Sequence, residues 1–223
     1  MTRRRGGLRR PGEWLGRAVA LLLALGVSVA GPEAARFPAL FGTREVRSAN
    51  LAPFPKWTGM LARDLADRDL DEGSCASATF NRCHLRDWRA FLDRIRDRNP
   101  MAQLDAVNRY MNQAPYIIDP RNYGVPDYWA TPHQFLARDG DCEDYAIAKY
   151  MSLKALGWDP GAMRVVVLRD LNLQTAHAVL VVYRDDVAWM LDNQIETVVD
   201  AARIQHYRPY YSINEDGWWL HRP

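Results

Sequence analysis

The sequence predicts an α+β domain in which helices come first and an antiparallel sheet follows. Two observations carry this prediction. Between residues 56 and 155 apolar residues recur at helical spacing, and after residue 160 they form alternating or β-branched runs of strand length. The chain of 223 residues is long enough for one such domain with appendages, and 48% hydrophobic with 25% charged residues is a globular composition.

The first thirty residues differ from the rest of the chain. Residues 1–17 contain six arginines and one glutamate, and residues 18–30 form the apolar stretch "AVALLLALGVSVA". A basic start, a short apolar core and a small-residue site before Gly31 predict an export signal over residues 1–30, cut near Ala30. The alternative is an uncleaved inner-membrane anchor. In either case we expect the domain to lie in the periplasm.

The charge of the chain depends on this leader. The whole chain has 29 basic and 27 acidic residues, and residues 1–30 hold six of the former and one of the latter. The remaining chain is therefore weakly acidic. A nucleic-acid-binding function, which needs a basic surface, is not supported.

Residues 31–55 are rich in proline and weakly patterned, which predicts an extended N-terminal arm ahead of one domain over residues 56–223. Amphipathic spacing then predicts three helices, at residues 56–70, 85–98 and 100–114.

The segment 115–132 has turn-forming prolines and reads as a loop, followed by a short helical turn at 131–138. Its aromatic residues between 116 and 129, like Trp218 and Trp219, either wall a groove or belong to the core. Strand-like runs follow at residues 162–170, 175–184, 187–194, 207–213 and 217–221.

Cys142 stands where a polar turn becomes a helix. Asp141 is a good N-cap, and Asp144 three residues later completes a variant of the capping box. The helix N-terminus lowers the pKa of a thiol, whereas the negative charges of Asp141 and Glu143 oppose that effect. A cation bound by the acids, or a histidine partner, would settle this competition.

A histidine partner is available on the predicted sheet. His177 lies eight residues before Asp185, in a predicted hairpin turn, and Asp192 lies seven residues after it, so both fall near the same end of adjacent strands. With Cys142 delivered to that end, the three form a Cys-His-Asp arrangement. Each residue also has a purely structural interpretation, as a buried thiol, a core histidine or a strand end.

The other two cysteines, Cys75 and Cys83, flank a short loop. In an oxidising compartment they either form a disulfide or remain two unpaired thiols. Cys142 is left over in both cases. Thiol–disulfide exchange is not expected, because the chain has no C-x-x-C motif.

Several segments together resemble one family. The segments "YWATPHQFL", "GDCEDYAIAKY", "TAHAVLVV", "LDNQ" and "YRPYYSINEDGWWLH" resemble the bacterial transglutaminase-like cysteine proteinases, the periplasmic LapG-type adhesin-cleaving proteases of the papain-like superfamily. The resemblance covers about residues 50–221. It implies a papain-like or transglutaminase-like fold, with the helical part packed on an antiparallel sheet and the nucleophile at a helix N-terminus.

The resemblance also implies roles for particular residues. Cys142 would be the nucleophile, His177 the base and Asp192 the orienting acid. Calcium would be held by Asp141 and Glu143, with Asp144 as a weaker ligand. The calcium charge would offset the repulsion between these acids and a thiolate.

The family's characterised activity is endoproteolysis of large exported RTX-type adhesins near their N-terminal ends, which controls surface attachment and biofilm. An inner-membrane receptor for cyclic di-GMP sequesters the protease. For this chain, substrate and receptor are expectations by analogy.

The chemistry implied is acyl transfer to water, with the oxyanion held by the Cys142 N–H and a second donor. Gln134 and Trp129 precede the nucleophile and are candidates for that donor, although packing is the more ordinary role. Two alternatives stay open. One is a transglutaminase or amidase acting on cell-wall peptides, and the other is a non-catalytic, calcium-stabilised binding module.

Overall fold

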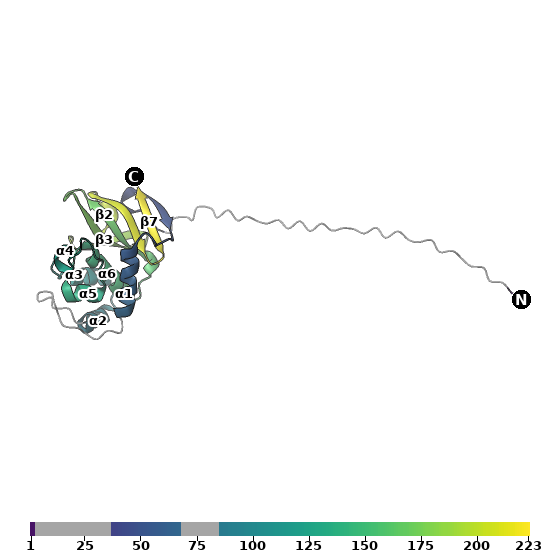
Figure 1. The fold of residues 1–223 in the computed structure, drawn as a ribbon, viewed down its shortest axis with the longest axis horizontal. Coiled ribbons are helices and arrows are strands. Elements are labelled where there is room, and N and C mark those ends of the chain that lie inside the picture. Colours follow the sequence, from purple (N-terminus) through teal and green to yellow (C-terminus); the bar gives the residue numbers. More distant parts are fainter. Residues whose placement is uncertain (3–36, 68–84) are drawn as a thin grey trace. The chain divides into compact units, whose positions relative to one another are not determined.

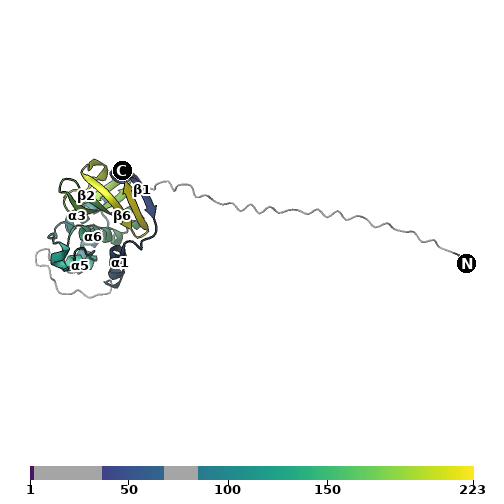
Figure 2. The same ribbon diagram turned by 45° about the horizontal axis from the view of Figure 1, so that its top comes forward.

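The computed structural model describes residues 1–2, 37–67 and 85–223. The predicted export signal, and the possible disulfide between Cys75 and Cys83, lie outside the described residues. Within residues 37–223 the chain forms an antiparallel sheet with helices gathered against it (Figures 1 and 2). The predicted α+β class is confirmed.

The helices precede the long strands, as predicted. They are α1 (Pro55–Asp67), α2 (Leu85–Ile95), α3 (Pro100–Met111), α4 (Asp119–Asn122), α5 (Pro132–Arg138) and α6 (Cys142–Ala155). The strands are β1 (Arg44–Ser48), β2 (Met163–Asp170), β3 (Thr175–Arg184), β4 (Val187–Leu191), β5 (Val199–Asp200), β6 (Tyr207–Asn214) and β7 (Gly217–Arg222).

The described strands form one seven-stranded sheet in the order β1-β7-β6-β2-β3-β4-β5, with antiparallel pairing throughout. The predicted hairpin between β3 and β4 is present. Asp185 and Asp186 form its turn with φ of 52° and 60°, the left-handed conformation that two-residue hairpins favour. This turn fixes the register that pairs Leu180 with Leu191.

Two parts of the chain are more ordered than the sequence predicts. We expected residues 31–55 to be an extended arm, but its described part contributes β1, which pairs with β7 at the edge of the sheet. We expected residues 115–132 to be a loop, but they contain the short helix α4 and a bridge from Tyr116 to Gly140. Both features depend on partners distant in sequence, which local patterns do not reveal.

The sheet has an apolar cluster on each face. Along β3, Leu180 and Val182 face the cluster shared with the helices, whereas Val179 and Val181 belong to the cluster that includes Leu40. This alternation follows from the two-residue period of a strand. Burying both faces explains why β3 reads as a nearly continuous apolar run.

Helix α6 lies at the centre of the domain. Every residue of Asp144–Leu153 is buried, and the helix contacts β2 and β3 as well as α3 and α5. The start of the helix packs tightly against the preceding turn. A Cβ atom added at Gly140 would clash with Oδ2 of Asp144. Glycine at this position therefore lets Asp144 approach the backbone.

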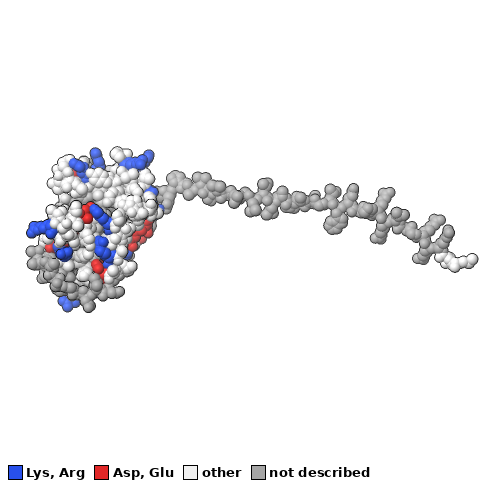
Figure 3. Space-filling view, in the orientation of Figure 1, with Lys and Arg blue, Asp and Glu red and all other residues white. Residues whose placement is uncertain are grey.

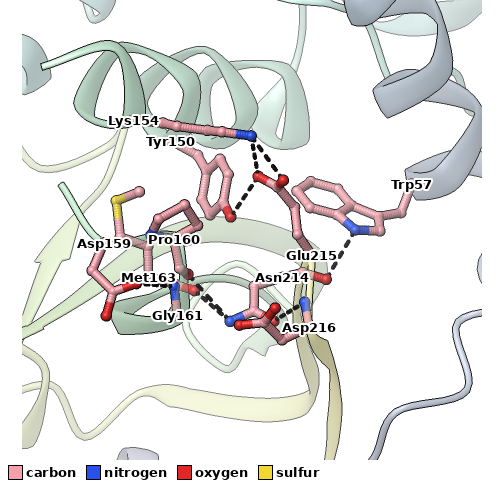
Figure 4. A network of polar contacts seen from close by, with 10 residues as sticks. All are labelled: Trp57, Tyr150, Lys154, Asp159, Pro160, Gly161, Met163, Asn214, Glu215 and Asp216. Carbon is pink, nitrogen blue, oxygen red and sulfur yellow. Dashed lines mark hydrogen bonds and ion pairs between the residues drawn. The ribbon is translucent and has the colours of Figure 1, made fainter. Parts of the chain in front are cut away.

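Side chains from α6 and α1 hold the turn between β6 and β7 (Figure 4). The Lys154 ammonium donates to both carboxylate oxygens of Glu215, at 2.6 and 2.7 Å, and the Tyr150 hydroxyl donates to one of them at 3.1 Å. The Trp57 indole donates to the carbonyl of Asn214 at 3.1 Å. These bonds fasten the sheet to the helices at this turn.

A buried ion pair joins the edge strand β1 to the middle of the sheet. Arg164 is 4% exposed and donates to Glu45 at 2.7 Å. Its guanidinium lies 3.6 Å from the ring centre of Trp219 and 4.9 Å from that of Tyr183. Burial lowers the pKa of the neighbouring His221 to about 4, so that histidine is neutral at pH 7 and Arg164 is the cation that balances Glu45.

On the face shown in Figure 3, lysine and arginine side chains lie in several separate places, and aspartate and glutamate side chains are also visible. The charge of that face is therefore mixed. None of the helices that the structure describes is both long and apolar enough to cross a membrane.

We expect Arg164→Ala to lower the free energy of unfolding by about 3 kcal/mol, because it leaves the Glu45 carboxylate without its buried partner. Urea denaturation measures this change. The control is Arg208→Ala on the neighbouring strand, whose exposed side chain should change the stability by less than about 0.5 kcal/mol. Equal effects of the two substitutions would contradict the assigned role of the pair.

Candidate active site

A histidine and an aspartate from neighbouring strands meet at one end of the sheet. His177 lies near the start of β3, and Asp192 directly follows β4. Nε2 of His177 is 2.9 Å from Oδ1 of Asp192, and the two residues are 3% and 1% exposed. The structure thus brings these two residues together as the hairpin offset predicted.

Several donors hold the Asp192 carboxylate in place. Oδ1 also accepts the main-chain N–H of Gln194 at 2.8 Å, and Oδ2 accepts the hydroxyl of Tyr207 at 2.7 Å. Burial alone would raise the pKa of this carboxyl, but the hydrogen bonds from His177, Gln194 and Tyr207 outweigh burial and lower it. Asp192 is therefore ionised and faces the imidazole as an acceptor.

The ring of His177 has a second nitrogen available for chemistry. Because Nε2 faces Asp192, Nδ1 is the nitrogen left to exchange a proton with a reacting group. The amide of Gln194 lies 3.4 Å from Nδ1.

Cys142 is the first residue of α6, and its side chain is partly buried. The main-chain N–H of Ala178, which follows His177 in the chain, hydrogen-bonds to the Cys142 sulfur. The thiol in turn donates to Oε2 of Glu143 at 3.2 Å. The nucleophile predicted from the sequence therefore lies against the strand that carries the histidine.

The surroundings of Cys142 oppose ionisation of the thiol. Burial raises its pKa well above the usual value, and the negative charges of Glu143 and Asp141 raise it further, whereas the N–H of Ala178 lowers it. The opposition between a helix N-terminus and nearby acids, expected from the sequence, is thus present in the fold.

Five acidic side chains surround the start of α6. Three of them were expected from the sequence: Asp141, Glu143 and Asp144. Asp119 from α4 and Asp127 from the loop after it join them, and their oxygens form overlapping groups within 4.8 Å. These two aspartates were not predicted from the sequence, because aspartates beside prolines are also ordinary turn formers.

This cluster has the properties of a site for a hard cation. Asp119 and Asp141 each have a buried Oδ1 with no hydrogen-bond partner among the described residues. Burial raises the pKa of Asp119 to about 6, and burial with the charges of Asp141 and Asp144 raises that of Glu143 to about 9. Carboxylate oxygens at this density fit a calcium ion, which takes six to eight oxygen ligands.

Asp144 has a different function from its neighbours. Its Oδ1 accepts the N–H of Ala130 at 2.7 Å, and its Oδ2 accepts the N–H of Asp141 at 3.3 Å. It therefore fixes the start of α6 and remains the weaker candidate as a ligand.

The two candidates for the second oxyanion donor are engaged elsewhere. The side-chain amide of Gln134 bonds to the Tyr128 hydroxyl and to the N–H of Thr131, as part of the cap of α5. Trp129 is buried and lies edge-on to Trp57. These contacts fit the packing interpretation, and the second oxyanion donor stays unassigned.

A tyrosine that the sequence did not single out lies beside the nucleophile. The hydroxyl of Tyr116 interacts with Cys142, and burial together with the thiol raises the pKa of this tyrosine. The N–H of Ile117 donates to the carbonyl of Gly140 at 2.9 Å, which holds this segment next to the start of α6. Tyr116 is 55% exposed, so a substrate can reach it.

Comparisons with known proteins identify a family and similar structures. The family model described as "Bacterial transglutaminase-like cysteine proteinase BTLCP" matches residues 75–220. The structure is similar to that of Legionella pneumophila LapG, with a TM-score of 0.55 and 34% identity over 60% of this chain and 76% of that one. No curated protein matches the chain significantly.

Two further structures of the same Legionella protein are similar. The calcium-bound form has a TM-score of 0.57 and 31% identity over 71% of this chain and 84% of that one. The EGTA-treated form has a TM-score of 0.56 and 33% identity over 61% of this chain and 75% of that one.

A buried lysine lies within the electrostatic influence of Asp192. Lys149 of α6 is fully buried, and its Nζ has no hydrogen-bond partner among the described residues. It lies 5.8 Å from the ring centre of Tyr145. Burial lowers the pKa of Lys149 to about 7, against the attraction of Asp192, which raises it.

This lysine should make the stability depend on pH. Its folded pKa of about 7 is below the value of about 10.4 in an unfolded chain, so the unfolded state binds more protons between these limits. The contribution of Lys149 to stability therefore rises with pH. From pH 7 to pH 10 we expect the free energy of unfolding of the natural protein to rise by about 3 kcal/mol relative to that of Lys149→Met.

Chemical denaturation at each pH measures this difference. Lys154→Met on the same helix removes the ion pair with Glu215 and serves as the control. A difference in the free energy of unfolding that stays constant across this pH range would contradict the lowered pKa of Lys149.

Proposed function

The chain belongs to the bacterial transglutaminase-like cysteine proteinase family, and we propose that it is a calcium-dependent cysteine endopeptidase. The observation that carries the proposal is the meeting of Cys142, at a helix N-terminus, with the strand on which His177 pairs with Asp192. We assign Cys142 as nucleophile, His177 as general base and Asp192 as the acid that orients the imidazole.

The proposed reaction starts with a proton transfer. Nδ1 of His177 takes the proton of the Cys142 thiol, and Asp192 stabilises the imidazolium that results. The thiolate then attacks the carbonyl carbon of a substrate peptide bond. The oxyanion that forms is held by the Cys142 N–H at the start of α6, where unpaired N–H groups and the helix dipole favour negative charge.

Hydrolysis completes the proposed cycle. The imidazolium returns its proton to the leaving amine as the C–N bond breaks, which leaves the substrate as a thioester on Cys142. A water molecule, deprotonated by His177, then releases the carboxylic acid and restores the thiol. The products are two peptides, with one molecule of water consumed.

We propose that Asp119, Asp127, Asp141 and Glu143 would hold a calcium ion. When bound, this ion would supply positive charge that offsets the negative charge of these acids, and Glu143 would then accept a weaker hydrogen bond from the thiol. The raised pKa values of Asp119 and Glu143, and the unpartnered oxygens of Asp119 and Asp141, support this choice of ligands.

The proposed substrate is a large exported adhesin of the RTX type, cleaved near its N-terminus in the periplasm. Cleavage would release the adhesin from the cell surface and disperse a biofilm. The proposed regulator is an inner-membrane receptor for cyclic di-GMP. Family membership supports these proposals, and the export signal predicted over residues 1–30 supports the location.

We expect the protein to cleave the N-terminal part of a large repeat-rich adhesin from the same genome when calcium is present. Cys142→Ala and His177→Ala should abolish cleavage, and Asp192→Asn should leave a small remainder, because the imidazole loses its orienting acceptor. Electrophoresis and mass spectrometry of the products measure the reaction. Thermal unfolding of each variant shows that the fold is retained.

Two outcomes would contradict this proposal. Full activity of Cys142→Ala would exclude the assigned nucleophile. Products joined by a new amide bond, rather than separated with the mass of one water added, would favour a transglutaminase.

We also expect calcium to stabilise the protein. A ligand at a hundred times its Kd adds about 2.7 kcal/mol, which corresponds to a rise of roughly 5 to 10 °C in the unfolding midpoint of a domain of this size. Differential scanning calorimetry with calcium and with a chelator measures the shift. Asp119→Asn and Glu143→Gln should reduce the shift to less than half.

The matched control is Asp97→Asn, which changes an exposed carboxylate outside the cluster. It should leave the calcium-dependent shift unchanged. An undiminished shift in both cluster variants would place the calcium elsewhere.

A further inference from the structure

Tyr207, the first residue of β6, reaches the candidate active site from a strand that is not adjacent to β4. It is 5% exposed, and its hydroxyl donates to Oδ2 of Asp192 at 2.7 Å. Its ring centre lies 5.7 Å from that of His177, with the two planes at 58°. One side chain therefore contacts both members of the histidine–aspartate pair.

The contacts of Asp192 show what Tyr207 contributes. The main-chain carbonyl of Asp192 is held separately by Asn112 at 2.8 Å, and Oδ1 is shared between His177 and the N–H of Gln194. These contacts fix the backbone and one oxygen, but a carboxylate can still rotate about its Cβ–Cγ bond. The Tyr207 hydroxyl fixes the second oxygen, and with it the plane in which Oδ1 faces Nε2.

We infer that Tyr207 is a positioning residue for the reaction, and this inference rests on the proposed function of Cys142, His177 and Asp192. Its hydroxyl holds the carboxylate plane, and its ring limits the tilt of the imidazole. Both effects hold the imidazole in the orientation that the proposed reaction needs. Without the hydroxyl, the ring should be held less firmly and Cys142 should react more slowly.

Tyr207→Phe tests this inference, because it removes one oxygen and keeps the ring. The readout is the alkylation rate of Cys142 by iodoacetamide at pH 6 in calcium-containing buffer, where a thiol reacts mainly through the ion pair with histidine. Peptide mass spectrometry assigns the rate to Cys142 and separates it from Cys75 and Cys83. This assay needs no knowledge of the substrate.

The control is Tyr183→Phe. Tyr183 is also buried on the face of the sheet that carries Tyr207, but it lies against Arg164 and Phe37. His177→Ala sets the rate without an ion pair. We expect Tyr207→Phe to lower the rate at pH 6 by about ten-fold, since a hydrogen bond to a charged group is lost. Tyr183→Phe should stay within about two-fold of the natural protein.

Each outcome has a distinct meaning. If His177→Ala slows alkylation but Tyr207→Phe does not, the role of Tyr207 is excluded and the proposed function stands. An equal loss in both phenylalanine variants also excludes it, because the loss would then be structural. If His177→Ala reacts at the natural rate, no ion pair exists, and the proposed function falls together with this inference.

Discussion

The structure depends on the burial of α6 along almost its whole length. A helix covered by β2 and β3 as well as by α3 and α5 cannot shift along its axis without breaking contacts on every side. Its N-terminus is therefore fixed near the start of β3, where Ala178 meets the Cys142 sulfur. The same constraint buries Asp144 at its start and Lys149 in its middle, and sets Lys154 against Glu215 at its end. The polar residues of this helix thus mark where it touches other parts of the molecule.

The acids around Cys142 are costly to the fold unless something balances them. Carboxyls packed this closely raise one another's pKa, and they raise the pKa of the thiol beside them. Among the described residues, Lys56 pairs with Asp127 at the exposed rim of the cluster, whereas the buried Lys149 is attracted by Asp192. A cation bound from solution would reduce both the repulsion among the carboxylates and the raised pKa of the thiol. The ionisation of Cys142 and the charge of the acid cluster are therefore physically linked.

The parts of this fold that follow from local pattern could be predicted from the sequence. The three amphipathic helices, the hairpin at Asp185 and the approach of His177 to Asp192 depend on periodicity and on counting residues from a turn. Asp119 and Asp127 could not be predicted, because they join the acid cluster only when the segment before α4 pairs at Tyr116 with Gly140. β1 was missed for the same reason: five residues without an apolar pattern pair only because β7 presents a free edge. Lys149 falls within a helical pattern, and nothing nearby in the sequence shows that all its sides are covered.

The position of Tyr207 depends on an irregularity in the sheet. The pairing of β2 with β6 shifts between Val167 and Leu168, where β6 contains one extra residue. In a regular strand Tyr207 and Tyr211 would point to the same face, since they are four residues apart. The extra residue reverses the alternation, so Tyr211 packs with the helices and Tyr207 lies on the opposite face with Val179. Burial, followed by the charges of Asp127 and Glu143, raises the pKa of Tyr211, while Tyr207 bonds to Asp192. The bulge thus lets Tyr207 reach Asp192 while Tyr211 of the same strand packs with the helices.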